Sequence, residues 1–210
     1  MERPVIIFGT GGLARTALDI FLKNNVLVYA FLTEDEAEVN TEINDIIVMG
    51  LIDDDAFIKR ATSDAEVFVA LEDQHERLEL AELLIKKYKK MPINAIHPSA
   101  QIAADVSLGH GNLIGAGTTI GAGVNLGSHN VISSGVHVEQ QAKLAESILV
   151  GAGAVLGASS QTEKSVYVGS GAVIGAGVHL GASVKVGAGA VVIRSVEEGK
   201  TVFGNPAQEV

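Results

Sequence analysis

The sequence predicts an α/β protein in two parts: a small Rossmann-like N-terminal half-domain, residues 1–92, and a left-handed parallel β-helix, residues 93–210. Three observations carry this prediction. The C-terminal half has an aliphatic residue at almost every sixth position, aromatic residues make up only 4% of the chain while Gly numbers 24, and the chain opens with a strand, a glycine-rich turn and a helix. A core without large rings has to be built from small and branched side chains stacked in a regular repeat.

The first ninety residues alternate strand and helix patterns. The apolar run 5–8 predicts a buried strand, and the periodic segment after the glycines predicts a helix as far as about Lys23. Further strands are expected over 26–31 and 66–70, and further helices over 53–61 and 74–88. About ninety residues suffice for one half of a doubly wound dinucleotide-binding fold, so a mononucleotide or a nucleotide-sugar is expected rather than NAD.

The glycine-rich turn predicts a binding site for an anion. Gly9, Gly11 and Gly12 allow backbone N–H groups to approach a phosphate at the helix N-terminus. Glu34 and Asp35 follow the second strand, at the place where an acidic side chain accepts a hydrogen bond from a ribose hydroxyl. We therefore expect these five residues to bind the nucleotide-sugar; the alternative is that the glycines only form a tight turn.

The C-terminal half carries a six-residue comb of apolar side chains. Stepping by six from Ile96 to Val192 meets seventeen positions, and all are Ile, Leu or Val except Thr162. This period fits neither a helix nor a hairpin, so it indicates a coil of three hexads, a triangular prism in which residues eighteen apart stack on one face. The pattern ends at Glu198.

One column of this prism predicts a groove. The column through Gln140 contains Ala122, Ala158 and Ala176, and it ends at Arg194. Small side chains leave room for an elongated ligand, and a guanidinium at the end suits a phosphate tail.

Composition excludes several classes of function. The net charge is −10, and residues 1–92 carry 18 of the 25 acidic side chains, so nucleic acid is not an expected partner. The absence of cysteine excludes disulfides and thiolate metal sites, and no apolar stretch approaches the length of a membrane span. We expect a cytoplasmic protein that binds no metal and no membrane.

Several segments together resemble the bacterial hexapeptide-repeat sugar O- and N-acyltransferases, typified by sialic acid O-acetyltransferase and UDP-amino-sugar N-acetyltransferases. The resemblance rests on the start 5–14, the segment 30–35, the His97-Pro98-Ser99-Ala100 segment, the hexads and the C-terminal Gly204-Asn205-Pro206-Ala207. It implies a homotrimer that binds acetyl-CoA between neighbouring prisms and a nucleotide-sugar in the N-terminal domain. It also implies Ala158, Ala176, Ala188 and Arg194 as CoA contacts, with Ala188 off the column of the others.

The sequence departs from that family at its histidines. The resemblance places the general base at Gln140 and its orienting acid at Gln141, and Leu149 and Leu13 replace two further family histidines. Glutamine has no group that titrates near neutral pH and does not act as a base. His137, three residues before Gln140, is a possible substitute base, and a surface role is its alternative.

Three functions follow as hypotheses. The first is an acetyl-CoA-dependent acyltransferase acting on a nucleotide-linked or free amino sugar in surface-glycan biosynthesis. The second is a catalytically impaired homologue that still binds nucleotide-sugar or CoA, motivated by Gln140. The third is an assembly scaffold without CoA binding.

Overall fold

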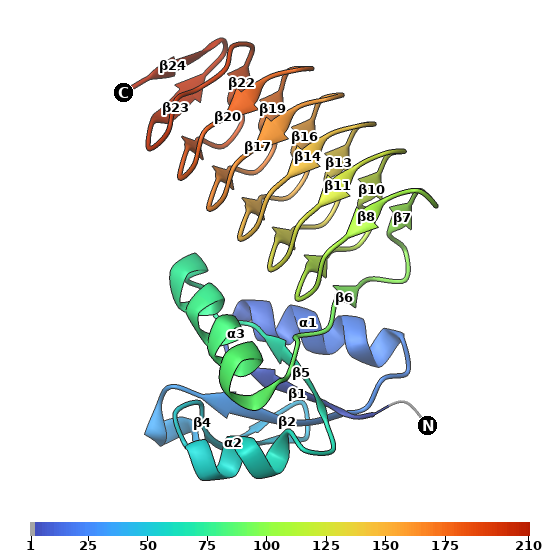
Figure 1. Cartoon of the computed structure of the whole chain (residues 1–210), viewed down its shortest axis with the longest axis vertical. Helices are drawn as coiled ribbons and strands as arrows, with labels where there is room; N and C mark the ends of the chain where they lie inside the picture. The colour runs from blue at the N-terminus through green and yellow to red at the C-terminus, as the bar shows by residue number, and fades with distance from the viewer. Residues whose placement is uncertain (1–2) are drawn as a thin grey trace. The chain divides into compact units, whose positions relative to one another are not determined.

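The computed structural model describes residues 3–210. The chain forms two compact units, Met1–Pro98 and Ser99–Val210 (Figure 1). None of the helices in the described part of the chain has both the length and the apolar content needed to span a bilayer.

The N-terminal unit is built on a five-stranded sheet of order β3-β4-β2-β1-β5. Neighbouring strands are parallel except for the antiparallel β3–β4 pair. The strands are β1 (Val5–Phe8), β2 (Val28–Thr33), β3 (Glu42–Ile43), β4 (Ile46–Leu51) and β5 (Glu66–Val69). The helices are α1 (Gly12–Lys23), the 3-10 turn η1 (Glu36–Glu38), α2 (Asp55–Ala61) and α3 (Gln74–Tyr88).

Helices cover both faces of this sheet because the strands are apolar on both sides. On one face, Phe21 of α1 packs edge-on against Phe68 of β5, with ring centroids 5.6 Å apart. On the other, Ile58 of α2 and Leu84 of α3 join a buried cluster with Ile6 and Phe8 of β1. A strand buried on both faces reads as a continuous apolar run, as 5–8 does.

The sequence prediction found most of these elements and missed one hairpin. The second strand begins at Val28 rather than residue 26, and α2 begins at Asp55 rather than residue 53. The strands β3 and β4 were not expected. Their turn is Asn44-Asp45, with φ of 49° and 63°, which is the left-handed conformation of a two-residue hairpin turn. The Asn44-Asp45 dipeptide was the signal in the sequence that could have predicted this hairpin.

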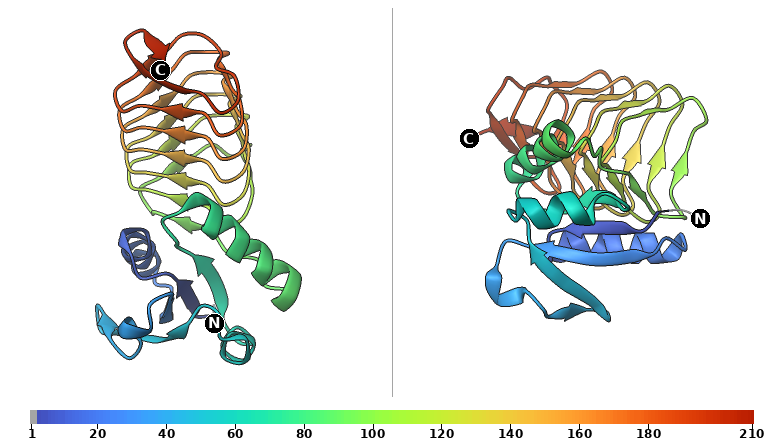
Figure 2. Two further views of the ribbon diagram at one scale, coloured as in Figure 1. Left: turned by 90° about the vertical axis from the view of Figure 1, so that its left-hand side faces the viewer. Right: turned by 60° about the horizontal axis from the view of Figure 1, so that its bottom comes forward.

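The C-terminal unit is the parallel β-helix that the six-residue period predicts. Two-residue strands pair with the strand eighteen residues away, for example Thr119 with His137 and Val138 with Leu156. The second residue of each of these strands is a comb residue, and most comb side chains are buried in the core. Figure 2 shows the successive coils stacked one above another along a common axis.

The prism has three faces, which we number along the coil. Face 1 consists of β7 (Gln101–Ile102), β10 (Thr119–Ile120), β13 (His137–Val138), β16 (Val155–Leu156), β19 (Val173–Ile174) and β22 (Val191–Val192). Face 2 consists of β8 (Ser107–Leu108), β11 (Asn125–Leu126), β14 (Lys143–Leu144), β17 (Gln161–Thr162) and β20 (His179–Leu180). Face 3 contains β9 (Leu113–Ile114), β12 (Val131–Ile132), β15 (Leu149–Val150), β18 (Tyr167–Val168), β21 (Lys185–Val186), β23 (Thr201–Gly204) and β24 (Ala207–Glu209). The short strand β6 (Ala95–Ile96) precedes them in the chain.

Three corners join the faces. Corner 1, between faces 1 and 2, carries the column of Gln140; corner 2, between faces 2 and 3, carries His110 and His129; corner 3, between faces 3 and 1, carries Ala188. Inside corner 2, two fully buried asparagines tie the coils together. Asn112 Oδ1 accepts from Asn130 N at 2.8 Å, and Asn130 Oδ1 accepts from Ile148 N at 2.7 Å.

The outward side chains of the faces differ in polarity. Face 2 presents Lys143, Gln161 and His179. Face 1 presents polar residues in its first three coils and valines in its last three, of which Val173 is 37% exposed. Face 3 presents Tyr167, which is 39% exposed. Apolar outward surface is therefore concentrated on faces 1 and 3.

Candidate functional site

The column predicted to form a groove lies along corner 1. Consecutive coils are joined there by backbone hydrogen bonds, from Gln141 N to Ala122 O at 2.9 Å, from Ser159 N to Gln140 O at 3.0 Å and from Gly177 N to Ala158 O at 2.9 Å. Between Gln140 and Arg194 the column presents only Ala158, half-buried, and Ala176, exposed. Three coil spacings make this small-residue strip about 14 Å long.

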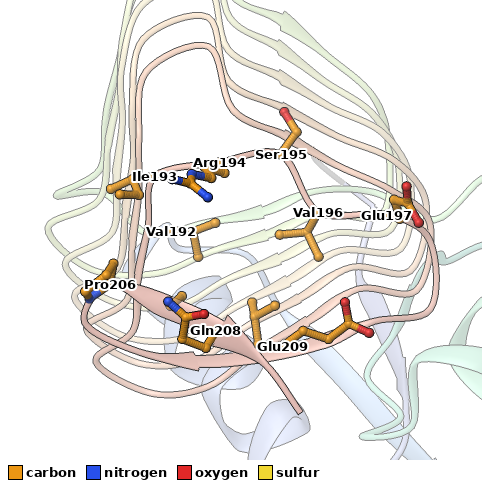
Figure 3. A pocket seen from close by; sticks show the side chains of 11 residues that line it. Val192, Ile193, Arg194, Ser195, Val196, Glu197, Pro206, Gln208 and Glu209 are labelled. Atoms are coloured by element: carbon orange, nitrogen blue, oxygen red, sulfur yellow. The ribbon is translucent and has the colours of Figure 1, made fainter.

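Arg194, at the far end of the strip, lines a cavity of about 490 Å³ at the C-terminal end of the prism (Figure 3). The cavity lies between the last coil and the β23–β24 hairpin, and Val192, Val196 and Val202 line it. Among the described residues Arg194 has no hydrogen-bond or ion-pair partner, and its side chain is exposed. Its guanidinium is therefore available to an anionic group.

Ala188 does not join the other predicted CoA contacts within one chain. It lies at corner 3, where Ser170 stacks below it, whereas Ala158 and Ala176 lie at corner 1. The off-column position expected from the sequence thus corresponds to a different edge of the prism.

Gln140 and Gln141, at the positions expected for the base and its orienting acid, are exposed at corner 1. Gln141 has a φ of 59°, and its Oε1 accepts a long hydrogen bond of 3.4 Å from Ser159 Oγ. An amide offers hydrogen bonds but takes up no proton near neutral pH. Leu149 lies on face 3 and Leu13 in α1, so neither of these apolar replacements supplies a titrating group.

His137 lies on face 1, with its side chain outward and exposed. Its Nδ1 lies 2.8 Å from Thr119 Oγ1, on the strand directly below in the sheet. Beside this pair is a hollow of about 590 Å³ to which Gln101, Thr119 and Glu139 contribute polar side chains. The hollow was not predicted; the eighteen-residue stacking of polar residues at 101, 119 and 137 was its signal in the sequence.

The N-terminal unit has a pocket of about 410 Å³ at the carboxyl ends of its parallel strands. Four of the five predicted substrate contacts line it, namely Gly9, Gly11, Glu34 and Asp35, and Gly12 begins α1 beside it. Gly9 is required by its geometry, since its φ is 119° and a Cβ there would lie 2.6 Å from Ala70 O. A crevice at the carboxyl ends of parallel strands is the usual place for a ligand in such a sheet.

The pocket is strongly acidic, which the sequence reasoning did not foresee. Besides Glu34 and Asp35, four further carboxylates line it, from Glu38, Glu72, Asp73 and Glu76. Hydrogen bonds donated by Thr10 and Thr33, each of 2.6 Å to Oε2, lower the pKa of Glu38. Burial, and then the charge of Glu76, raise the pKa of Glu34.

The expected anion position at the start of α1 is filled by the protein itself. Leu13 N donates to Glu72 Oε1 at 2.8 Å, and a Cβ on Gly11 would lie 2.9 Å from the same oxygen. A carboxylate at a helix N-terminus satisfies a free N–H and complements the helix dipole. The glycine-rich turn in this conformation therefore accommodates Glu72 rather than a phosphate, and the pocket around it suits hydroxyl and amino groups.

Two histidines lie closer together than their spacing suggested. His110 and His129 stand on different columns of the prism, yet their rings are in contact at corner 2, with centroids 4.7 Å apart. Residues nineteen apart occupy adjacent corner positions of consecutive coils. His179 lies on face 2, with Nε2 3.1 Å from Glu163 Oε1. Among the described residues, no group of three or more His, Cys, Asp or Glu side chains is placed to hold a metal ion.

Comparisons with known proteins agree with this architecture. The family model for the hexapeptide repeat of succinyl-transferase matches residues 105–141, 147–182 and 163–194. A search of curated protein sequences found no match.

Solved structures similar to the chain include sugar acetyltransferases. PerB from Caulobacter crescentus, in complex with CoA and GDP-perosamine, is 28% identical with a TM-score of 0.90 over 99% of this chain and 97% of that one. A His-to-Asn variant of perosamine N-acetyltransferase from the same bacterium, with the same two ligands, is 27% identical with a TM-score of 0.90 over 99% and 96%. The acetyltransferase domain of PglB from Neisseria gonorrhoeae FA1090, in complex with acetyl coenzyme A, is 21% identical and shows the shared fold, with a TM-score of 0.90 over 100% of both chains.

Proposed function

We propose, on the premise that this chain is similar over its whole length to the hexapeptide-repeat sugar acyltransferases, that it is an acetyl-CoA-dependent N-acetyltransferase of a nucleotide-linked amino sugar. The observation that carries the proposal is the similarity, at 28% identity over 99% of the chain, to an enzyme bound to CoA and GDP-perosamine. Its expected place is the biosynthesis of surface glycans.

Corner 1 suits the acetyl-CoA. Ala158 and Ala176 leave the strip free of protruding side chains, so an extended arm lies flat against the coils. The exposed Arg194 beside the 490 Å³ cavity offers a guanidinium to phosphate groups. When bound, acetyl-CoA supplies the activated acetyl group; the chain itself binds and aligns it.

The acidic N-terminal pocket suits the hydroxyl groups of a nucleotide-sugar. Glu34 and Asp35 line it at the carboxyl end of β2, where a carboxylate accepts hydrogen bonds from a ribose. Glu72 competes with a diphosphate for the start of α1, so we propose that it moves aside or that the diphosphate lies elsewhere. In this proposal the N-terminal unit is a Rossmann-like half-domain.

The impaired-homologue hypothesis rests on Gln140, and a relative bears on it. The His-to-Asn variant of the perosamine enzyme holds both CoA and GDP-perosamine, so in that enzyme binding does not require the replaced histidine. An amide in this chain is thus compatible with binding, and activity depends on another proton acceptor.

We further propose a left-handed coil, a homotrimer and a cytoplasmic location. Faces 1 and 3 carry outward apolar side chains, including Val173 and Tyr167, whereas the outward residues of face 2 are polar. Burying the two apolar faces against neighbouring copies leaves face 2 to solvent and corner 1 at the edge of the interface.

The direct test is release of CoA from acetyl-CoA in the presence of nucleotide-linked amino sugars, GDP-perosamine among them. Because the chain has no cysteine, a thiol reagent detects CoA without background from the protein. Turnover on at least one acceptor is expected. No turnover on the panel by a folded protein contradicts the proposal.

Calorimetric titration of acetyl-CoA tests the corner 1 site without an acceptor. Arg194→Ala should weaken binding about tenfold, as expected for loss of a charged hydrogen bond. The matched control is Lys164→Ala, which removes an exposed cation from corner 2. If the parent and Arg194→Ala bind acetyl-CoA equally well, the CoA phosphates do not contact Arg194.

A further inference from the structure

The transfer of an acetyl group to an amine requires a proton acceptor, and the column of Gln140 at corner 1 does not supply one. The attacking nitrogen loses a proton as its bond to the acetyl carbon forms, and a positioned base accelerates that step. The column at corner 1 consists of alanines and Gln140, and Arg194 lies at corner 1 of the last coil. None of these side chains accepts a proton near neutral pH.

His137 lies three residues before Gln140 on the same coil, and a contact with a neighbouring side chain orients its imidazole ring. Its ring is exposed, and one nitrogen, Nδ1, lies 2.8 Å from Thr119 Oγ1. The β10–β13 pairing places Thr119 directly beside it, and β7 places Gln101 beside Thr119. Strand positions 101, 119 and 137 thus form a polar ladder on an otherwise aliphatic face.

Glu139 complements this pair. It follows Val138, whose side chain points inward, so Glu139 and His137 both project from the outer surface of face 1. Glu139 is exposed, lines the 590 Å³ hollow, and has no side-chain partner among the described residues. Its carboxylate is available to accept a hydrogen bond from an amino group.

We propose that His137 is the general base of this enzyme, that Thr119 is its positioning residue, and that Glu139 binds the amino group of the acceptor in the hollow. The inference rests on the proposed function. The neutral amine attacks the thioester carbonyl, the N–C bond forms and the C–S bond breaks. His137 Nε2 takes the proton from the nitrogen and delivers it to the departing thiolate, which leaves as CoA.

Thr119 acts through the tautomer of the imidazole. A neutral histidine has one protonated and one free ring nitrogen, and the partner of one nitrogen decides the state of the other. In this assignment Nδ1–H donates to Thr119 Oγ1, which leaves the Nε2 lone pair free for the acceptor. The arrangement replaces the family's orienting carboxylate by a hydroxyl from the coil below.

The kinetic experiment uses the full chain with acetyl-CoA and an accepted amino sugar. His137→Asn should lower kcat about 100-fold or more with little change in acetyl-CoA affinity. Thr119→Val should lower kcat about tenfold and alter the acidic limb of the pH profile, and Thr119→Ser should restore both. Glu139→Gln should raise the KM for the acceptor more than it lowers kcat.

The matched control is His179→Gln, which removes a half-buried histidine at the same strand position on face 2 and should leave kcat unchanged. Activity of His137→Asn within twofold of the parent overturns the proposal.

An independent readout does not need turnover. In protein labelled with nitrogen-15 at histidine, the neutral His137 ring should be the Nδ1–H tautomer, and Thr119→Val should remove this preference. Observation of the Nε2–H tautomer in the parent overturns the assignment even if the protein is inactive on every sugar tested. Correct tautomer without turnover would instead contradict the proposed function alone.

Discussion

Thr162 stands where the other comb residues are aliphatic, and its side chain is buried inside face 2. Its relative exposure is 4%, and its Oγ1 has no hydrogen-bond partner within residues 3–210. A buried hydroxyl without a partner carries a desolvation cost that an isosteric methyl group does not. The residue is thus a local exception to the pattern that forms the core.

Thr162→Val should therefore stabilise the protein by about 1–2 kcal/mol, measured as a rise in the thermal midpoint of a few degrees. Thr118→Val is the matched control, because Thr118 is equally buried but donates to Ser133 O at 3.1 Å. That variant should lose stability. A fall in the midpoint of Thr162→Val would show that the hydroxyl has a partner in solution.

His110 is a second polar residue whose environment affects the stability of the fold, in this case as a function of pH. Burial lowers its pKa from the ordinary value of 6.5, and its buried Nδ1, which lies against His129, has no hydrogen-bond partner in the described part of the chain. Since the folded protein takes up this proton less readily than the unfolded chain, its full stability is present above pH 6.5. Stability falls as the pH drops below 6.5 toward the lowered pKa, because the unfolded chain is protonated first.

The measurement is the urea midpoint at pH 7.5 and pH 5.5. The parent should lose stability at the lower pH, and His110→Phe, which keeps a ring against His129, should lose less. His179→Gln should behave as the parent does. An equal loss in the parent and His110→Phe would assign the acid sensitivity to other groups.

At the scale of the coil, two classes of glycine have different functions. Gly157 ends a strand where the next coil passes closely, and a Cβ there would lie 2.7 Å from Ala176 N. Gly153 turns corner 3 with a φ of 68°, and a Cβ there would meet nothing within 4 Å. The first glycine sets the spacing of the coils and the second only the direction of the chain.

Gly157→Ala should accordingly be severely destabilising, by about 3 kcal/mol or more, because backbone rather than a mobile side chain has to shift. Gly153→Ala should cost only about 1–2 kcal/mol of left-handed strain. Denaturant titrations of the two variants give the comparison. Equal losses would mean that the coils can separate to admit a methyl group at corner 1.

At the scale of the whole molecule, the apolar outward side chains of faces 1 and 3 favour assembly with further copies. Val173 and Tyr167 are more than a third exposed in the single chain, at 37% and 39%. Regularly spaced apolar side chains on a flat face suit an identical face of the same coil spacing. The polar first half of face 1, with His137 and Thr119, then borders that interface.

Val173→Glu should dissociate the assembly, because a carboxylate buried at the interface would have no partner. Light scattering should give a mass near three times the 21.8 kDa chain for the parent and a single chain for the variant. Lys143→Glu, on face 2, should leave the mass of the parent unchanged. A monomeric parent would contradict the proposed homotrimer.

The sequence by itself determined the coil, the column at corner 1 and most of the N-terminal elements. A six-residue period has one simple packing solution, so Ala122, Gln140, Ala158 and Ala176 stack as counted. The last coil departs from the count, because Val192 pairs with Ile174 but Val196 pairs with Leu180, which makes corner 1 two residues shorter at Arg194. Strands that are buried on both faces can also be predicted, because they form continuous apolar runs in the sequence, as at 5–8. These features depend on the periodic order of apolar residues along the chain, which can be seen in the sequence without the structure.

Only the tertiary structure decided which polar groups meet. Glu72 reaches the start of α1 from 59 residues away, His129 packs on His110 across a corner, and Thr119 holds His137 through the sheet. Hydrogen bonds and ring contacts depend on positions fixed to a few tenths of an ångström. The sequence therefore fixes the columns by their period, whereas the partner of each polar side chain depends on how neighbouring coils and loops are placed in space.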